Sequence, residues 1–515
     1  MRKSSLAASA PRRALRVLRR EAWVLFIAAL AFVTRIGWNT VVHPPRNFVY
    51  SDMHGYFNRA DDFVKQPLTA AYDYLAFYPW GTHAYLGLVK LLFTTPEACP
   101  REVKDSIAAP GCVPMDIAMA LLGAIGVVYT TLIARRLTQR TPDHPATGRR
   151  RWVYVVIGLA AVFYYPFLAQ GSYFLSETPF FACLAAATYH SLRLADEGKT
   201  HDALLFGIFT GLGAWVRPQI LMSVALLALF WLFRRRELRG ASLKKLVLAM
   251  VPVALMLAFS AVRTTRHARM HDKNEFALVS TNDALNYAFG RCHPISIEAR
   301  AKGYRSAFGP PSLGSLFFGA RQQRRKKQPV FLELKPALPD DMACEVNRRH
   351  KEKKEPSEPC LLIQGKMWSR DILGDLSKKC VEKTGYSRQA YYALTHVALN
   401  FGFNFTWPDS GQRLRQTRVL GLSIPSGRPV MEPFQIGFGI AVVPFALIAC
   451  ALAFLRRRAR DGILSMHILA ATVVAILYFG ETRMRTPYDF LFLILGLDLL
   501  SRIFTKLGRK LRALL

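Results

Sequence analysis

The 515-residue chain has few acidic side chains and lacks the patterns that mark the common nucleotide-binding and zinc-binding domains. It contains 35 aspartates and glutamates against 69 lysines and arginines, which gives a formal net charge of +34. It has no zinc-ligand spacing, no Walker phosphate loop and no GxGxxG fingerprint. No internal repeat is present either. These absences exclude zinc-finger, P-loop and Rossmann domains of the usual kind.

The excess of positive charge points to a membrane rather than to nucleic acid. A soluble protein with this balance would be expected to bind nucleic acid, but here the bases cluster beside long apolar runs. Positive-inside anchoring and contact with anionic membrane lipids therefore account for the charge, and no nucleic-acid partner is expected. The chain is 51% hydrophobic with a mean hydropathy of +0.16. That value predicts a helical membrane body with a sizeable polar part.

Ten apolar runs are long enough to be considered as membrane spans. They are residues 22–39, 117–134, 152–169, 174–192, 203–216, 218–233, 246–262, 437–455, 463–479 and 487–500. The region 203–233 is divided in two, because a single span would place Arg217 in mid-membrane and reverse the side of the basic loop 234–245. The sequence thus predicts an all-α polytopic membrane protein of about ten transmembrane helices.

Basic loops predict the orientation of these helices. Arginine and lysine cluster in loops 135–151, 234–245 and 456–460, so both termini and these loops are expected in the cytoplasm. The predicted organisation is a basic N-terminus 1–21 that is retained as an anchor, a transmembrane module 22–262 with outer loop 40–116, a large outer loop 263–436, C-terminal helices 437–500 and a basic tail 501–515. Within the first outer loop, Gly81–Phe93 is expected to form an amphipathic or re-entrant helix. The predicted location is the plasma (inner) membrane, with the periplasmic face outside.

The cysteines fit this topology. Six fall in the two outer loops: Cys99, Cys112, Cys292, Cys344, Cys360 and Cys380. Cys183 and Cys450 fall in predicted spans. An even number outside indicates an oxidising compartment and favours a local Cys99–Cys112 bridge. Six free thiols are the alternative, and the pairing of the other four is left open.

Six short motifs, in order along the chain, resemble those of the C-type (GT-C) glycosyltransferases. They are SDMHGY at 51–56, YPWGTHAYL at 78–86, LSETP at 175–179, GLGAWVRP at 211–218, STNDALNYAFG at 280–290 and RMRTPY at 483–488. The resemblance is to the bacterial dolichyl-phosphate-mannose-protein mannosyltransferase-like and ArnT-like membrane enzymes. It implies a GT-C-like fold with juxtamembrane helices in the first outer loop.

The resemblance also implies an activity. Such enzymes move a hexosyl or pentosyl group from a polyprenyl-phosphate donor to a hydroxyl of a glycan, lipid or protein acceptor, with inversion. Asp52, just beyond the first span, is the expected general base. Arg217, Arg483 and Arg485 are expected on the donor phosphate, because guanidinium groups bind phosphate through paired hydrogen bonds and stay charged.

Glu177 has two interpretations. It orients the acceptor or shares a divalent cation with Asp52, or else it caps the helix that begins near Thr178. No metal-ligand set is assigned. Residues expected to bind substrate are His54, Tyr56, Tyr78, His83, Asn282, Asn286 and Tyr287. Two other functions stay open: a lipid-linked glycan transporter or flippase, and a non-catalytic envelope assembly factor.

Overall fold

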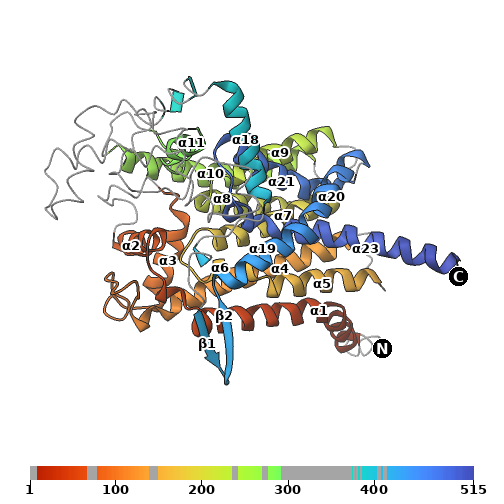
Figure 1. The fold of residues 1–515 in the computed structure, drawn as a ribbon, viewed down its shortest axis with the longest axis horizontal. Helices are drawn as coiled ribbons and strands as arrows, with labels where there is room; N and C mark the ends of the chain where they lie inside the picture. Colours follow the sequence, from red (N-terminus) through yellow and green to blue (C-terminus); the bar gives the residue numbers. More distant parts are fainter. Residues whose placement is uncertain are drawn as a thin grey trace, which may run out of the picture.

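The computed structural model describes residues 9–65, 78–138, 149–234, 242–269, 276–291, 374, 377–378, 381–382, 385–402, 408–409, 415–456 and 458–514. Its long helices lie side by side in one bundle (Figure 1). Both termini lie at one end of the bundle, the terminal end, and α2 and α3 lie at the opposite end, the site end. This arrangement is the one that an even number of membrane crossings requires.

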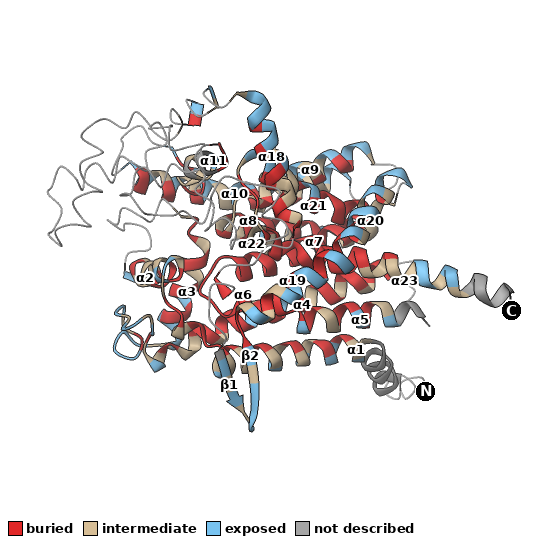
Figure 2. Cartoon of the chain, viewed as in Figure 1, coloured by how far each residue is buried: buried red, intermediate tan, exposed pale blue. Residues whose placement is uncertain are grey.

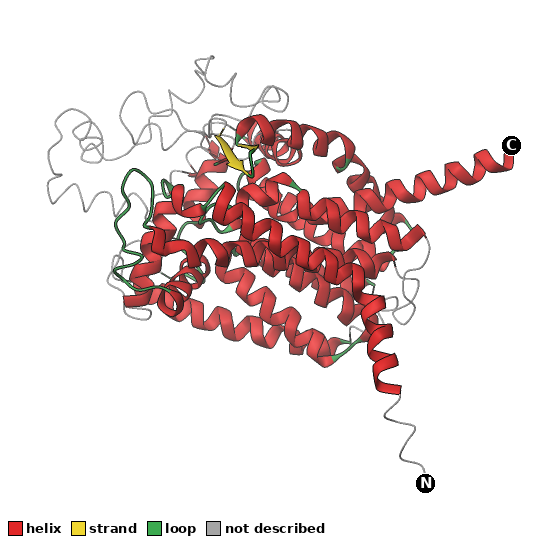
Figure 3. Ribbon diagram, turned by 90° about the horizontal axis from the view of Figure 1, so that it is seen from below, coloured by secondary structure: helices red, strands yellow, loops and turns green. Residues whose placement is uncertain are grey.

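Helices make up almost all of the regular structure in the described residues (Figure 3). They are α1 (Ser9–Gly37), α2 (Asp52–Lys65), α3 (Gly81–Phe93), α4 (Val113–Thr138), α5 (Arg149–Phe163), α6 (Tyr165–Gly171), α7 (Glu177–Glu197), α8 (Thr200–Val216), α9 (Ile220–Phe233), α10 (Leu243–Ala268), α11 (Asp283–Arg291), α18 (Tyr386–Phe401), α19 (Arg428–Ala441), α20 (Val443–Leu455), α21 (Ala459–Leu477), α22 (Thr482–Arg485) and α23 (Asp489–Leu514). A π-helical turn, η1 (Trp38–Val42), extends α1. Strands β1 (Arg415–Val419) and β2 (Leu422–Ser426) form an antiparallel hairpin, with Arg415 opposite Ser426.

All ten predicted apolar runs are helical, and the all-α multi-pass membrane fold is confirmed. In the described part of the chain, five helical segments are long and apolar enough to cross a membrane, and α5 with α6 makes a sixth if the bent pair is one span. The five are Glu21–Asn47, Pro110–Thr138, Leu243–Ala268, Arg428–Leu455 and Ala459–Leu477. Helix α9 is apolar but shorter. The full count of ten crossings stays a prediction.

The bundle is buried at its centre and apolar on its outside. Figure 2 shows buried residues concentrated along the helices that lie inside the bundle. On α10 several large apolar side chains face outward, among them Leu255 at 67% and Val262 at 72% exposed. Such a face would be costly in water, and a lipid bilayer is the solvent that suits it.

The bend between α5 and α6 has a clear local cause. The two helices meet at an angle of 43°, where the sequence predicts one continuous run. Pro166 has no backbone N–H, so the carbonyl of Val162 loses its usual helical donor. The buried Arg35 of α1 replaces it: Nη1 donates to the Val162 carbonyl at 3.3 Å and Nη2 to the Ala161 carbonyl at 3.2 Å. A cation at a helix C-terminus is also favoured by the helix dipole.

The site end is built on α2 and α3, which pack against each other. The helix predicted at Gly81–Phe93 is present with those bounds. Its Lys90 is buried and its Nζ donates to Asp61 of α2 at 2.5 Å. Leu91, Leu92 and Phe93 are more than half exposed at its end. The end of α3 therefore exposes apolar side chains, while its buried Lys90 links the helix to α2.

The predicted disulfide between Cys99 and Cys112 is present. It closes the loop between α3 and α4, and that loop also bonds to the segment after the first span. The amide of Val49 donates to the Ser106 carbonyl at 2.9 Å, and the amide of Ala108 donates to the Arg46 carbonyl at 2.8 Å. Cys183 and Cys450 are reduced. Cys292, Cys344, Cys360 and Cys380 lie outside the described residues.

Replacing Cys99 and Cys112 together by serine is expected to lower the free energy of unfolding by about 3 kcal/mol, since a loop of this length loses its cross-link in the unfolded chain. Thermal unfolding of the purified protein in detergent measures the change. Cys450→Ala is the matched control, because it removes a thiol that is not cross-linked. An unfolding midpoint equal to that of the unaltered protein would show that the bridge does not stabilise this loop.

Candidate active site

Four charged side chains meet at the site end, from four separate segments. Nη2 of Arg217 donates to Oε1 of Glu177 at 2.6 Å. Nε of Arg483 donates to the same oxygen. Nη1 and Nη2 of Arg483 both lie 3.4 Å from Oδ2 of Asp52. The structure thus joins Asp52, Arg483, Glu177 and Arg217 into one connected cluster, the acid–arginine cluster.

Local structure explains why these side chains converge. Glu177 is the first residue of α7, where the positive end of the helix dipole favours a carboxylate. Arg217 is the extended residue that ends α8, with φ −149° and ψ 108°, and the following Pro218 disfavours the α conformation at this position. Nε of Arg217 donates to the hydroxyl of Ser176 at 2.9 Å, which adds a second link to the start of α7. Arg483 lies in the short helix α22.

The four side chains differ in exposure, and that difference separates two kinds of carboxylate. The Glu177 side chain is fully buried, and those of Arg217 and Arg483 are each 12% exposed. The Asp52 side chain is 36% exposed. Among the described residues, Oε2 of Glu177 has no hydrogen-bond partner. Glu177 therefore holds two guanidinium groups in place, while the Asp52 carboxylate stays partly accessible.

A third carboxylate, Glu481, lies close to the cluster and was not predicted. Burial raises its pKa, while Arg483 opposes that shift and Glu177 adds to it. Burial alone would lower the pKa of Arg483, but the carboxylates of Glu177, Asp52 and Glu481 outweigh it and raise that pKa. Arg483 is therefore firmly cationic. The one signal in the sequence is that Glu481 precedes Arg483 by two residues.

Two tyrosines and an arginine form the side of the cluster next to Asp52. Asp52, Tyr56 and Arg59 follow one another at helical spacing on α2, so they share one face. The guanidinium of Arg59 lies 4.1 Å from the ring centroid of Tyr78, and the rings of Tyr56 and Tyr78 are 6.1 Å apart. Burial, with a smaller contribution from Asp52, raises the pKa of Tyr78 to about 12. Burial also raises the pKa of Tyr56.

Both phenols are therefore neutral hydrogen-bonding groups at physiological pH. Burial lowers the pKa of Arg59, and the charges of nearby groups, Tyr78 first, oppose that shift. The sequence prediction named Tyr56 and Tyr78 but not Arg59. The helical spacing from Asp52 was the available signal for Arg59.

The two predicted histidines lie apart from the acid–arginine cluster. His54 is exposed and its Nε2 lies 3.1 Å from the side-chain nitrogen of Asn58. It follows Asp52 by two residues and so lies on a different face of α2. His83 is fully buried in α3, and neither ring nitrogen has a hydrogen-bond partner among the described residues. Burial, then the charge of Arg59, lowers its pKa well below the usual range.

The predicted polar turn at 280–290 forms helix α11 beside the end of α21. The hydroxyl of Ser280 donates to the Asn282 side chain at 2.9 Å, and the amide of Asn286 bonds to the Asn282 carbonyl. Tyr287 is 38% exposed and its ring lies 6.4 Å from that of Tyr478. Figure 1 places α11 above the bundle, on the side where α18 lies. The Tyr287 ring thus joins this segment to the end of α21.

Gly290 shows how closely this helix approaches the chain just before Glu481. A Cβ atom at Gly290 would lie 1.6 Å from the carbonyl oxygen of Tyr478. Arg291 strengthens the contact, since its Nη2 donates to the carbonyls of Ile476 and Leu477 at 2.7 and 2.9 Å. The glycine is therefore required by packing, and α11 fixes the backbone that leads into the loop of Arg483.

Arg485 differs from the expectation that it reaches the donor phosphate. Its side chain is fully buried, and Nε donates to Asp489 at 2.8 Å. Nη2 donates to Gln435 at 2.9 Å, and the hydroxyl of Tyr164 donates to the other oxygen of Asp489 at 2.7 Å. The guanidinium is thus occupied by protein acceptors and ties α19, α23 and the α5–α6 junction together. Its position is that of a packing residue.

In the described part of the chain, no group of three or more His, Cys, Asp or Glu side chains could hold a metal ion. The carboxylates of Asp52 and Glu177 contact arginine instead.

Comparisons with known proteins give fold likeness at low identity. No protein-family model matches the chain, and no curated protein matches its sequence. The oligosaccharyltransferase of Archaeoglobus fulgidus in its apo form is 13% identical with a TM-score of 0.47, over 95% of this chain and 52% of that one. ArnT from Cupriavidus metallidurans in the apo state is 13% identical with a TM-score of 0.36. The match covers 92% of this chain and 78% of that one.

Two related structures carry a lipid phosphate. AglB from Archaeoglobus fulgidus, solved with an inhibitory peptide and a dolichol-phosphate, is 12% identical with a TM-score of 0.43, and ArnT bound to undecaprenyl phosphate is 12% identical with a TM-score of 0.36. The match covers 52% of the oligosaccharyltransferase, so this chain spans about half the length of that protein.

Proposed function

We propose that this protein is a membrane glycosyltransferase that moves a sugar from a polyprenyl-phosphate donor to an acceptor hydroxyl, with inversion at the anomeric carbon. The observation that carries the proposal is the acid–arginine cluster. The Asp52 carboxylate, 36% exposed, lies beside the guanidinium of Arg483, and the buried carboxylate of Glu177 pairs with both Arg483 and Arg217. A base next to a cluster of cations is what displacement of a phosphate by a hydroxyl requires.

In the proposed step, the acceptor oxygen attacks the anomeric carbon and its proton passes to Asp52. The bond between the anomeric carbon and the phosphate oxygen breaks, and the phosphate leaves on the polyprenyl chain with its added negative charge. Arg217 and Arg483 stabilise that charge by hydrogen bonds that strengthen as it develops. A single displacement inverts the configuration at the anomeric carbon.

The geometry of Arg483 suits a role on the donor. Its contacts with Asp52 are both 3.4 Å, longer than a good charge-assisted hydrogen bond, whereas its Nε is held closely by Glu177. The terminal nitrogens can therefore turn to a phosphate while the other side of the guanidinium stays anchored. Such a shift would also free the Asp52 carboxylate to accept the proton of the acceptor hydroxyl.

The neutral phenols of Tyr56 and Tyr78 supply hydrogen bonds for the sugar. A tyrosine hydroxyl both donates and accepts, as a sugar hydroxyl does, and an aromatic ring offers an apolar face for a sugar ring. Arg59, stacked on Tyr78 at 4.1 Å, keeps that ring in position beside Asp52. These three residues form the proposed sugar side of the site.

Replacing Arg217 by alanine is expected to lower kcat/KM for the donor by about 30- to 1000-fold, equivalent to about 2–4 kcal/mol, because one donor to the leaving phosphate is lost. Glu177 keeps Arg483 as its partner, so the fold is expected to hold. The assay is sugar transfer by purified protein in lipid with a panel of polyprenyl-phosphate sugars.

The matched control is Arg428→Ala, since Arg428 pairs with Glu432 outside the cluster. Equal loss in both variants, or none in Arg217→Ala, would contradict the role. Inactivity of the wild type across a broad panel would instead favour transport or assembly.

A further inference from the structure

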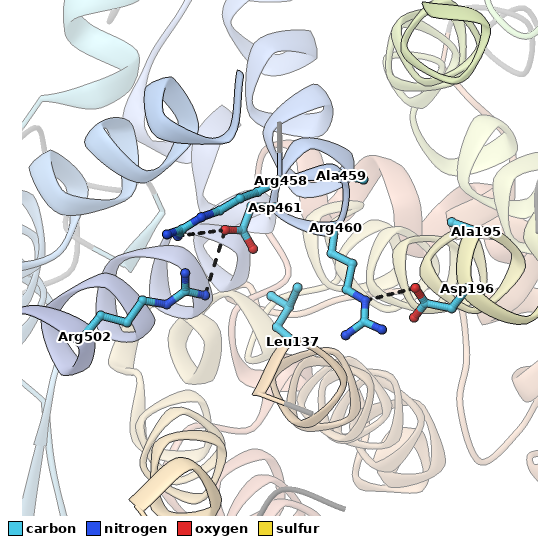
Figure 4. Close-up of a pocket in the computed structure, with 8 residues that line it drawn as sticks. All are labelled: Leu137, Ala195, Asp196, Arg458, Ala459, Arg460, Asp461 and Arg502. Atoms are coloured by element: carbon cyan, nitrogen blue, oxygen red, sulfur yellow. Dashed lines mark hydrogen bonds and ion pairs between the residues drawn. The ribbon is translucent and has the colours of Figure 1, made fainter. Parts of the chain in front are cut away.

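The charged pocket at the terminal end of the bundle is satisfied by its own residues. It is a cavity of about 400 Å³ between the ends of α4, α7, α21 and α23 (Figure 4). Arg460 pairs with Asp196, Asp461 lies between two arginines, and Arg502 also pairs closely with Asp498. Each arginine of the lining thus has an aspartate partner. A feature of a different kind, apolar and exposed, lies at the site end.

The β1–β2 hairpin at the site end carries an apolar tip that the described part of the chain leaves uncovered. Leu420 is 98% exposed and Leu422 is 71% exposed. Figure 2 shows the tip as exposed, in contrast to the buried faces of the helices in the bundle. Large apolar side chains in water cost free energy. The proposed sugar transfer uses neither leucine.

The backbone at the tip also disfavours leucine. Leu420 and Gly421 connect the strands as a two-residue turn, with φ of 51° and 79°, and Val419 pairs with Leu422 across it. Turns with positive φ at both positions favour asparagine, aspartate or glycine, because a bulky side chain is disfavoured there. Leu420 therefore combines an unfavourable backbone conformation with an exposed side chain. A contact beyond the hairpin would offset both costs.

The root of the hairpin fixes the level at which the tip lies. The hydroxyl of Thr417 donates to the Val42 carbonyl at 3.0 Å, and β1 packs against η1, the turn that extends α1. Leu420 is three residues beyond Thr417, so at about 3.3 Å a residue the tip lies within about 10 Å of the end of the first span. The hairpin points across the end of α1 and away from the bundle, not along the helices (Figure 1). The tip therefore lies where the first span leaves the membrane.

The first span itself exposes apolar side chains up to this level. Val33 of α1 is 70% exposed and Val41 of η1 is 52% exposed, in a segment that is apolar enough to cross a membrane. Val41 adjoins Val42, which the hairpin contacts. The headgroup zone outside the hydrocarbon core is about 5–7 Å deep on each side, so a hairpin that leaves the end of the span sideways stays within reach of it. The hairpin thus continues the lipid-facing surface of the span.

We propose that the tip of the β1–β2 hairpin inserts into the membrane interface at the site end, with Leu420 and Leu422 among the lipid chains. Arg418 is exposed and precedes Leu420 by two residues, so the two side chains lie on one face of the strand pair. A long basic side chain in this position reaches the headgroup phosphates. The contact holds the chain that leads into α19 beside the first span. It depends on the membrane fold and is independent of the proposed sugar transfer.

The first test places a thiol at the tip of the full chain, held in lipid nanodiscs so that both membrane faces are open to reagent. The Leu420→Cys protein is expected to react with a water-soluble maleimide at least about tenfold more slowly than the Asp105→Cys protein, because the thiolate is the nucleophile and an apolar setting raises the thiol pKa. Asp105 is the matched control, since it is an exposed turn residue with φ 48°. The unaltered protein gives the background from native thiols. Equal rates at the two positions would overturn the proposal.

The second test identifies what covers the tip. The photo-crosslinker p-benzoyl-phenylalanine replaces Leu422, and the protein is irradiated in nanodiscs of dioleoyl-phosphatidylcholine. Mass spectrometry is expected to find lipid attached to the hairpin peptide, as it should with the same probe in place of Leu255, which is 67% exposed on α10. The probe in place of Asp105 is expected to give no lipid adduct. A cross-link from the tip to another segment of this chain or to a second copy, or no adduct at all, would overturn the proposal.

Discussion

Asp52→Asn is expected to lower kcat for sugar transfer by about 10²–10⁴-fold and to leave the fold intact, since an amide cannot take the proton of the acceptor hydroxyl. The side chain is 36% exposed and lies at the first residue of α2, so a nearly isosteric amide fits there. Its oxygen can still accept from Arg483. Initial rates at saturating donor, with the unfolding midpoint measured on the same samples, separate loss of chemistry from loss of structure.

Asp105→Asn is the matched control for this change. Asp105 is an exposed aspartate of the same outer loop, with φ 48°, a conformation that asparagine also adopts readily. Its variant is expected to keep full activity. An Asp52→Asn protein that transfers sugar at the wild-type rate would rule out Asp52 as the base. A protein that loses activity only because its unfolding midpoint falls would give Asp52 a structural role instead.

Glu177→Gln is expected to lower both stability and activity, because Arg217 and Arg483 would be left largely buried around a neutral amide. Removing one partner of a buried ion pair typically costs about 3–5 kcal/mol. Glu177 is fully buried while both arginines are 12% exposed, so the loss is expected toward the lower end of that range. Thermal unfolding in detergent measures it. Glu432→Gln, in a half-exposed pair with Arg428, is the control and is expected to change stability by less than about 1 kcal/mol.

A double variant tests whether the loss comes from the uncompensated charge. Adding Arg217→Gln to Glu177→Gln removes one of the two stranded cations, so the pair is expected to be less destabilised than the sum of the single changes. Additive losses would mean that Glu177 stabilises the start of α7 independently of Arg217. In that case Glu177 would be a helix-capping residue rather than the anchor of the two arginines.

The helices could be predicted from sequence because long apolar runs have few alternatives in a membrane. Each of the ten runs is helical, and the surface helix at Gly81–Phe93 was predicted from its length and from Lys90 within it. The bend at Pro166 was missed, although a proline inside an apolar run is a signal for one. Its stabilisation by Arg35 depends on a side chain far away along the chain, as the separations of 126 and 127 residues show, and no local pattern reports that.

Part of the candidate site could also be predicted from the sequence, because the predicted spans fix which loops share a side of the membrane. Glu177, Arg217 and Arg483 lie at or between the ends of predicted spans, and Asp52 lies in the first outer loop. The charge pattern of the loops places all four on one side. Arg485 lies two residues from Arg483, yet burial and distant partners such as Gln435 direct it into the bundle. Spacing along the chain does not report such burial.

The remaining site residues show where the sequence carried a usable signal and where it carried none. Arg59 could have been found from its helical spacing to Asp52. For His83, only packing decides that the ring is fully buried in α3 rather than facing the site. Most of loop 263–436 lies outside the described residues.

The most direct test of the central claim is a cryo-electron microscopy structure of the purified protein with polyprenyl phosphate bound. We predict that the phosphate lies within hydrogen-bond distance of the guanidinium groups of Arg217 and Arg483, beside the carboxylate of Asp52. A phosphate that contacts neither arginine would contradict the claim.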